Sequence, residues 1–234
     1  MKRILTASLA SAVAVLMLAP APAMAGSADG KIQVKLLGTG VLPDGKIVGV
    51  EAVNTATTLG AAVAATTGPQ TSANDNYVPT IAVEYFFSPN ISVETICCLT
   101  QHHVSGAGGL AGTRLVDHVL VLPATLTLKA HLDAGPVKPY VGIGPSWFHI
   151  MGEKPGSTAR ALGVTRVKMT DEVGLAVQAG VDIPINEQGM GISIDAKKYF
   201  IDTHAIFYQG NTQALKTKHS LDPWVVSAGI TYRF

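Results

Sequence analysis

Charged residues are scarce in this sequence. Lys, Arg, Asp and Glu make up 14% of the 234 residues, against roughly 25% in a typical soluble domain. The 17 basic and 16 acidic residues nearly balance, so the chain lacks the basic excess of a nucleic-acid-binding protein and we expect no such partner. With 47% hydrophobic residues, the composition favours either a large soluble β-core or a membrane β-barrel.

Long apolar runs are absent beyond the first residues of the chain. A basic start and the apolar segment 4–18 precede the small-x-small motif Ala23-Met24-Ala25. This order predicts a secretory signal peptide over residues 1–25, cleaved after Ala25, rather than an uncleaved anchor. Residues 26–234 would then form a single exported domain, in which no run reaches the roughly 18 apolar residues of a membrane-spanning helix.

Cysteines and catalytic motifs are also lacking. Cys97 and Cys98 are adjacent and are the only two cysteines, too few for a disulfide framework or a zinc site. Neighbours in a strand point to opposite faces, so we expect one free thiol on each face. We interpret His102 and His103 as solvated loop residues rather than metal ligands. No nucleophile-elbow serine or phosphate-binding loop is present, so we expect no enzyme, cofactor or metal.

The dominant positive feature is alternation with a period of two residues. In the last segment every second residue is apolar, while the residues between them are mostly small or polar. Similar alternation recurs along the chain and predicts eight strands. They span residues 31–37, 77–87, 91–99, 118–132, 137–150, 173–183, 191–200 and 224–234.

The connections between these strands alternate between short and long. Short turns at one end, long loops at the other and an even strand number are typical of a bacterial outer-membrane barrel. Closure is required because an open edge in lipid leaves backbone groups unpaired. We therefore predict an all-β fold, an eight-stranded antiparallel up-and-down transmembrane barrel with short periplasmic turns and long extracellular loops. The alternative is a soluble lipocalin-like barrel, whose outer face should be charged.

In a transmembrane barrel the apolar face contacts lipid and the other face lines a narrow lumen that side chains nearly fill. Charges in such a lumen should pair, because an unpaired buried charge costs several kcal/mol. We expect a salt-bridged network near the short turns, either a plug or a polar core that fills space. Its predicted members are Glu84, Glu94, Lys129, Asp182, Asp195, Lys197 and Arg233.

Two further sets of residues follow from the assignment of faces. The first is apolar and lumenal, and forms either a hydrophobic ligand pocket or ordinary packing. Its members are Phe86, Ile96, Val119, Val121 and Phe148. The second consists of aromatic residues near strand ends, where interfacial girdles are expected. Its members are Tyr77, Tyr85, Trp147, Trp224, Tyr232 and Phe234.

Several short motifs, in their order along the chain, resemble the OmpW family of outer-membrane barrels. They are Asn90-Ile91-Ser92-Val93-Glu94, Leu122-Pro123-Ala124-Thr125-Leu126, Lys138-Pro139-Tyr140-Val141-Gly142-Ile143-Gly144, Gln178-Ala179-Gly180-Val181-Asp182, and Leu221-Asp222-Pro223-Trp224 with the final Tyr232-Arg233-Phe234. The resemblance implies an outer-membrane location with periplasmic termini and a narrow, partly apolar pocket open to the outside. It also implies that barrel-assembly machinery reads Phe234 as an end signal.

The same resemblance implies passive uptake of small hydrophobic solutes, with a lateral opening into the bilayer as one route. A structural or receptor barrel, whose extracellular loops bind partners without transport, remains the alternative. A barrel enzyme acting on lipids is a third reading, but no spacing suggests a Ser/His/Asp-type cluster.

Overall fold

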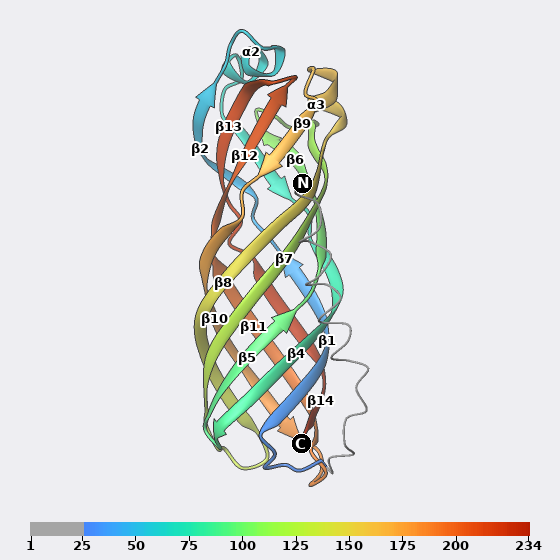
Figure 1. Ribbon diagram of the computed structural model, residues 1–234, viewed down its shortest axis with the longest axis vertical. Coiled ribbons are helices and arrows are strands. Elements are labelled where there is room, and N and C mark those ends of the chain that lie inside the picture. Colours follow the sequence, from blue (N-terminus) through green and yellow to red (C-terminus); the bar gives the residue numbers. More distant parts are fainter. Residues whose placement is uncertain (1–25) are drawn as a thin grey trace, which may run out of the picture.

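The computed structural model describes residues 26–234, in which eight antiparallel strands close into a barrel (Figure 1). The ring of strands closes because β7 pairs with β8 and β1 pairs with both β4 and β14. The predicted barrel is thus confirmed, while the predicted signal peptide lies outside the described residues. The barrel strands are β1 (Ile32–Leu42), β4 (Asn76–Ser88), β5 (Ile91–Cys97) continued by β6 (Thr100–Gly108), β7 (Arg114–His131), β8 (Lys138–Pro155), β10 (Glu172–Pro184), β11 (Met190–Phe200) and β14 (Trp224–Arg233).

The long extracellular connections are present as predicted, and they contain strands and helices that the alternation did not reveal. Four of their strands form a separate sheet in the order β2-β13-β12-β9, and β3 pairs with β6. This extracellular sheet continues the wall beyond the barrel strands (Figure 1). The added elements are β2 (Lys46–Val53), α2 (Thr58–Ala64), β3 (Pro69–Ala73), α3 (Ser157–Ala161), β9 (Arg166–Met169), β12 (Asp202–Gln209) and β13 (Thr212–Ser220).

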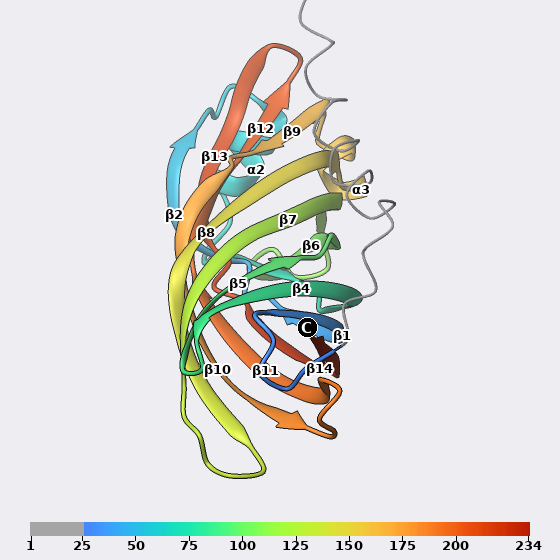
Figure 2. The ribbon, with the colours of Figure 1, turned by 60° about the horizontal axis from the view of Figure 1, so that its bottom comes forward.

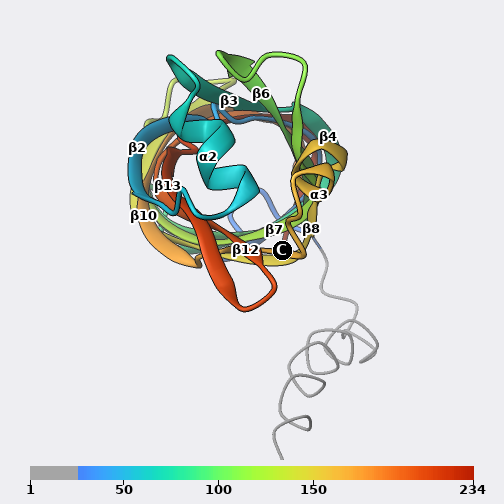
Figure 3. The ribbon, with the colours of Figure 1, turned by 90° about the horizontal axis from the view of Figure 1, so that it is seen from above.

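Helix α2 lies across the extracellular mouth of the barrel (Figure 3). Thr57 caps its first turn, because the Thr57 side chain accepts a hydrogen bond of 3.1 Å from the Gly60 amide. Leu59 and Val63 lie four residues apart on one helix face and are 1% and 7% exposed. The apolar face of α2 therefore points into the lumen. No helix among residues 26–234 has the length and apolar character needed to cross a bilayer.

The outer face of the barrel is apolar and the inner face is polar. On β7, Leu126 is 52% exposed, whereas its neighbours Thr125 and Thr127 are 2% and 1% exposed. Ile230 on β14 is likewise 57% exposed. A soluble barrel has the opposite sidedness, since water favours charge outside. The lipocalin-like alternative is therefore excluded.

Aromatic side chains lie near both ends of this apolar band, and Figure 2 shows the steep tilt of the strands between them. Tyr85 pairs with Ile32 and Tyr77 with Gly40, eight residues apart along β4. At roughly 3.3 Å per residue and a tilt of about 40°, this separation is about 20 Å, close to the apolar height of an outer-membrane barrel. The extracellular end carries Tyr77, Trp147 and Trp224, and the periplasmic end carries Tyr85, Tyr232 and Phe234.

We expect Leu126→Arg to destabilise the folded barrel in lipid vesicles by about 2–4 kcal/mol, because a charge near the bilayer midplane is costly. Val48 of β2, which is 56% exposed outside the membrane, provides the matched control. Val48→Arg should change stability by no more than about 0.5 kcal/mol. Urea unfolding in vesicles measures both, and equal effects would contradict this sidedness.

Candidate functional site: a buried ionic network beneath an apolar chamber

Three lysines and four carboxylates form a buried network in the half of the lumen nearest the short turns. Lys35 of β1 lies at its centre, with its Nζ 3.0 Å from Glu84 Oε2. The same Nζ lies 3.2 Å from Glu94 Oε2 and 3.2 Å from Asp182 Oδ1. The Lys35 side chain is only 1% exposed. An ammonium buried this deeply depends on its partners, because removal of one leaves an uncompensated charge.

Two further lysines extend the network across the barrel. Lys129 Nζ lies 2.8 Å from Glu84 Oε2 and 2.9 Å from Glu94 Oε2. Lys197 Nζ lies 2.7 Å from Asp195 Oδ1 and 3.1 Å from Glu94 Oε1. Glu94 therefore contacts three lysines. Positive and negative groups alternate through the network, which limits like-charge repulsion.

Neutral polar side chains satisfy the remaining acceptors. Gln178 Nε2 donates to Glu94 Oε1 at 2.9 Å and to Asp195 Oδ2 at 2.7 Å. The Tyr140 hydroxyl donates to Asp195 Oδ2 at 2.9 Å, and Lys129 Nζ lies 3.7 Å from the centre of the Tyr140 ring. Since an eight-stranded barrel is just wide enough for side chains to fill, this network occupies its cross-section.

The sequence identified most of this network but not its centre. Arg233 was predicted to belong to it, yet among residues 26–234 it makes no ion pair within 4.0 Å. Its Nε donates to the Gly30 carbonyl at 2.5 Å, and its guanidinium lies 3.7 Å from the Phe86 ring. Arg233 pairs with Gln33 near the start of β1, and at the periplasmic end it lines a small cavity together with Asp182. Lys35 was missed, although it alternates in phase with Gln33 on the polar face of its strand.

Above the ionic network the lumen changes from polar to apolar. Thr125 Oγ1 lies 2.8 Å from Ser146 Oγ and 3.2 Å from the Tyr199 hydroxyl. The Tyr199 ring, 1% exposed, packs edge-on against Phe148 with 5.3 Å between ring centres. Tyr199 thus presents its hydroxyl to the polar layer and its ring to the apolar region, and forms the floor of that region.

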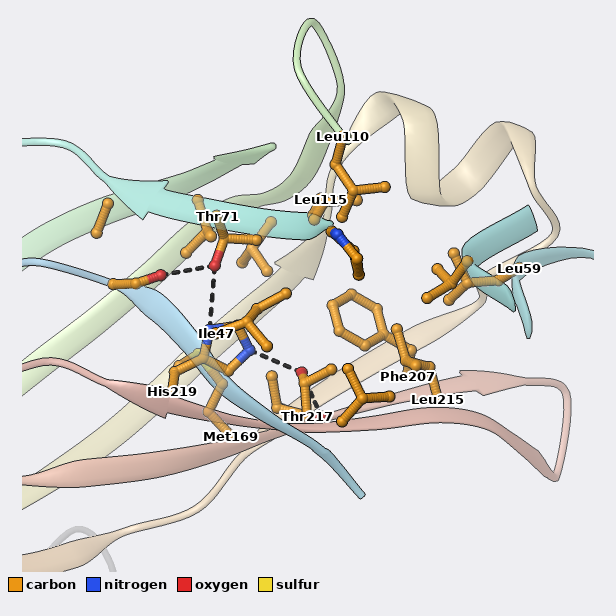
Figure 4. Close-up of a pocket in the computed structure, with 18 of the residues that line it drawn as sticks. Ile47, Leu59, Thr71, Leu110, Leu115, Met169, Phe207, Leu215, Thr217 and His219 are labelled. Carbon is orange, nitrogen blue, oxygen red and sulfur yellow. Dashed lines mark hydrogen bonds between the residues drawn. The ribbon is translucent and has the colours of Figure 1, made fainter. Parts of the chain in front are cut away.

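Two small apolar cavities follow in series toward the outside. The lower cavity, of about 50 Å³, includes the predicted lumen residues Val119, Val121 and Phe148 in its wall. The upper cavity, of about 40 Å³, is shown in Figure 4 and ends beneath Leu59 of α2. The residues shared by both walls are Ala73, Val104, Met169 and Leu221. Because of these shared walls, we call the pair the apolar chamber.

The other two predicted apolar lumen residues are buried but lie outside the chamber. Ile96 packs with Leu37 and Ala82 in a separate small cluster. Phe86 lies near the periplasmic end, where its ring centre is 5.1 Å from that of His131. Ile96 therefore fills space beside the ionic network. Phe86 lines a different cavity of about 30 Å³ at the periplasmic end, together with His131 and Arg233.

His219 of β13 is the one histidine in the wall of the upper cavity (Figure 4). Thr71 Oγ1 donates to the Gly45 carbonyl at 2.6 Å, so it accepts from His219 Nδ1 at 3.2 Å. His219 Nε2 then accepts from Thr217 Oγ1 at 2.7 Å. Burial lowers the pKa of His219 to about 4. The ring is therefore neutral near pH 7 and brings no charge to the upper cavity.

The barrel wall is interrupted beside the lower cavity. The β5–β7 ladder ends at Ile96–Thr125, and the β6–β7 ladder begins only at Thr100–Val121. In this gap Cys98 and Pro123 line the lower cavity, and a proline has no amide hydrogen to pair. Here Cys97 is exposed, Cys98 is buried and both thiols are free, as the alternation predicted.

Comparison with known proteins identifies the family of this chain. The model of the OmpW family matches residues 28–234. The chain belongs to the OmpW family. It is 32% identical to the uncharacterized outer-membrane protein y4mB of Sinorhizobium fredii, over 92% of this chain and 85% of that protein. It is 30% identical to outer membrane protein W of Salmonella typhi, over 64% of this chain and 69% of that protein.

Solved structures show the same fold. The crystal structure of OprG from Pseudomonas aeruginosa matches with a TM-score of 0.70 and 24% identity, covering 89% of this chain and 98% of that one. The solid-state NMR structure of outer membrane protein AlkL in lipid bilayers matches with a TM-score of 0.67 and 21% identity, covering 92% and 95%. This OmpW-family member is an outer-membrane protein, and recognition of Phe234 by the assembly machinery stays a prediction.

We expect Lys35→Ala to destabilise this OmpW-family barrel by roughly 3–5 kcal/mol, because three carboxylates lose a shared buried cation. If the network plugs the lumen, the same variant should raise single-channel conductance in planar bilayers. Arg233→Ala should change both quantities less, since Arg233 contacts a carbonyl and an aromatic ring instead. Unchanged conductance in Lys35→Ala would show that the network only fills space.

The neutral His219 also makes stability depend on pH. Its folded pKa lies below the unfolded value of about 6.5, so only the unfolded state binds a proton between these values. Stability is therefore complete above pH 6.5 and should fall by on the order of 3 kcal/mol as the pH drops toward 4. Urea unfolding of wild type and His219→Gln tests this, because the variant should lose that part of the pH dependence.

Proposed function

We propose that this protein admits small hydrophobic molecules from the cell exterior by passive diffusion, without a cofactor or an energy source. The observation that carries the proposal is the position of the apolar chamber, directly above a buried ionic network that obstructs the straight route. An apolar solute gains free energy on leaving water for such a chamber. The same solute would have to displace paired charges in order to continue to the periplasm, which is costly.

The chamber is nearly closed, so entry of a solute would require side chains to move. Its two cavities have volumes of about 40 and 50 Å³, well below the roughly 150 Å³ of an engineered apolar cavity that binds benzene. Leu59 of α2 and Met169 of β9 lie in its walls. Long, unbranched side chains such as that of methionine adapt readily to a new neighbour. We therefore expect the solute to open its own space, with α2 as the covering element.

The gap beside Cys98 offers a sideways exit from the lower cavity into the bilayer. Pro123 and Cys98 form the inner side of the gap, and Leu99 on its outer side is 52% exposed. The extracellular end of β4 also forms no backbone ladder with β6. Instead, the side-chain Nδ2 of Asn76 donates a hydrogen bond to the Gln101 carbonyl at 2.8 Å. An exit at this point would avoid the ionic network, because the lower cavity lies above that network. It would also break no backbone ladder.

Filling the lower cavity tests the proposal. We expect Val119→Trp to reduce uptake of an apolar fluorescent solute into proteoliposomes about tenfold or more, because Val119 is 3% exposed and lines that cavity. Leu128→Trp, at a lipid-facing position 55% exposed, should leave uptake at the wild-type rate. Equal uptake in wild-type and protein-free vesicles would overturn the proposal. It would favour the receptor alternative, in which the extracellular sheet binds a partner.

A further inference from the structure

The extracellular wall has a second interruption, between β8 and β9. The β8–β10 ladder ends at Phe148–Glu172. Beyond this point β8 faces β9, which pairs only with β12 on its other side. Two strand edges thus face each other without a backbone ladder, just outside the exposed Trp147 and Val173. The seam therefore begins where the membrane-spanning wall ends.

Carboxylates bridge this seam in place of a ladder. Asp171 Oδ1 accepts from the Ile150 amide of β8 at 2.8 Å, and Asp171 Oδ2 lies 2.6 Å from His149 Nδ1. From the opposite side, Glu153 Oε1 accepts from the Met169 amide of β9 at 2.8 Å. Each bridge depends on one rotatable side chain. The seam can therefore open without a shift in strand register.

An open groove of about 780 Å³ follows the seam on the outside, with Arg166, Lys168 and Glu153 among its lining residues. Met169 belongs to this groove and also to the walls of both cavities of the apolar chamber. It is 6% exposed, and Figure 4 shows its side chain among those around the upper cavity. Ile150, which is 5% exposed, also lines both the groove and the lower cavity. The buried side chains of Met169 and Ile150 thus separate the external groove from the chamber interior, and the unbranched Met169 is the more adaptable of the two.

We propose that the β8–β9 seam is a side entrance to the apolar chamber, with Met169 as its gate and Asp171 and Glu153 as its latches. This inference rests on the proposed function for its solute, a small apolar molecule. The charged rim keeps the groove wetted just outside the bilayer, while Ile150, Val167 and Met169 give it an apolar floor. A solute on that floor reaches the chamber when the Met169 side chain rotates away.

Thiol labelling tests the entrance without reference to transport. In a Cys97→Ser, Cys98→Ala background, Met169→Cys should react with a water-soluble, membrane-impermeant maleimide. Val104→Cys is the matched control, because Val104 is 8% exposed and lines both cavities but lies away from the seam. We expect Met169→Cys to react at least tenfold faster than Val104→Cys. Equal rates would overturn the proposal.

The latches supply a second, graded test. Adding Asp171→Ala and Glu153→Ala should speed labelling of Met169→Cys about tenfold or more, because opening then no longer breaks three hydrogen bonds, each of at least about 0.5 kcal/mol net. Asp171→Asn with Glu153→Gln keeps the acceptor oxygens and should label at the parental rate. Labelling that is insensitive to the alanine pair would exclude the latch role.

Proteoliposome uptake separates this inference from the proposed function. With native Met169, the alanine pair should raise uptake of the apolar fluorescent solute at least threefold. Asp202→Ala, which removes an exposed ion pair with Lys218 elsewhere on the extracellular sheet, should leave uptake unchanged. Wild-type uptake that the alanine pair does not alter would overturn the side entrance alone. Seam-specific labelling without any wild-type uptake would support the entrance and overturn the conduit.

Discussion

Closure of eight strands in lipid is the constraint on which the rest of this structure depends. Backbone amides and carbonyls have no water to bind inside a bilayer, so each must find a partner within the protein. A closed antiparallel ladder satisfies them, but with eight strands it leaves a lumen that side chains nearly fill. The inward residues therefore determine whether anything passes, and polar ones among them must pair with one another.

The narrow interior consists of two layers, one stabilised by ion pairs and the other by apolar packing. The periplasmic half holds Lys35, Lys129 and Lys197 among four carboxylates, all nearly excluded from solvent. Such a network is rigid because each charge depends on its neighbours. The extracellular half is held by dispersion and apolar burial, which have no directional requirement and tolerate rearrangement. A movable apolar layer above a fixed ionic layer is the arrangement on which the proposed sideways passage depends.

The sequence predicted the barrel well because its signal is local. Alternation identified eight strands and their lipid-facing sides, and the opposite exposures of Cys97 and Cys98 agree with it. The extracellular sheet escaped prediction because its inward residues are chemically mixed. Thr203, Ala205 and Phe207 all point inward on β12, so apolar residues there do not alternate. The burial of these residues depends on strands distant in sequence, which no local period reveals. Arg233 was misplaced because alternation gives a face but no height along the lumen.

Side-chain bridges appear where the wall stops being one continuous ladder. Besides the β8–β9 carboxylates, Gln70 of β3 accepts from the Ile47 amide at 3.1 Å and donates to the Ile47 carbonyl at 3.0 Å. The Gln70 side chain thus makes the two hydrogen bonds that the backbone of a neighbouring strand would make. Opening a ladder breaks many backbone hydrogen bonds together, whereas a rotating side chain breaks one or two, and water can replace those outside the membrane. Within the bilayer water is absent, so a gap is tolerated only where a residue such as Pro123 removes the need for a partner. Both openings proposed for this protein therefore lie where side chains, rather than backbone, complete the wall.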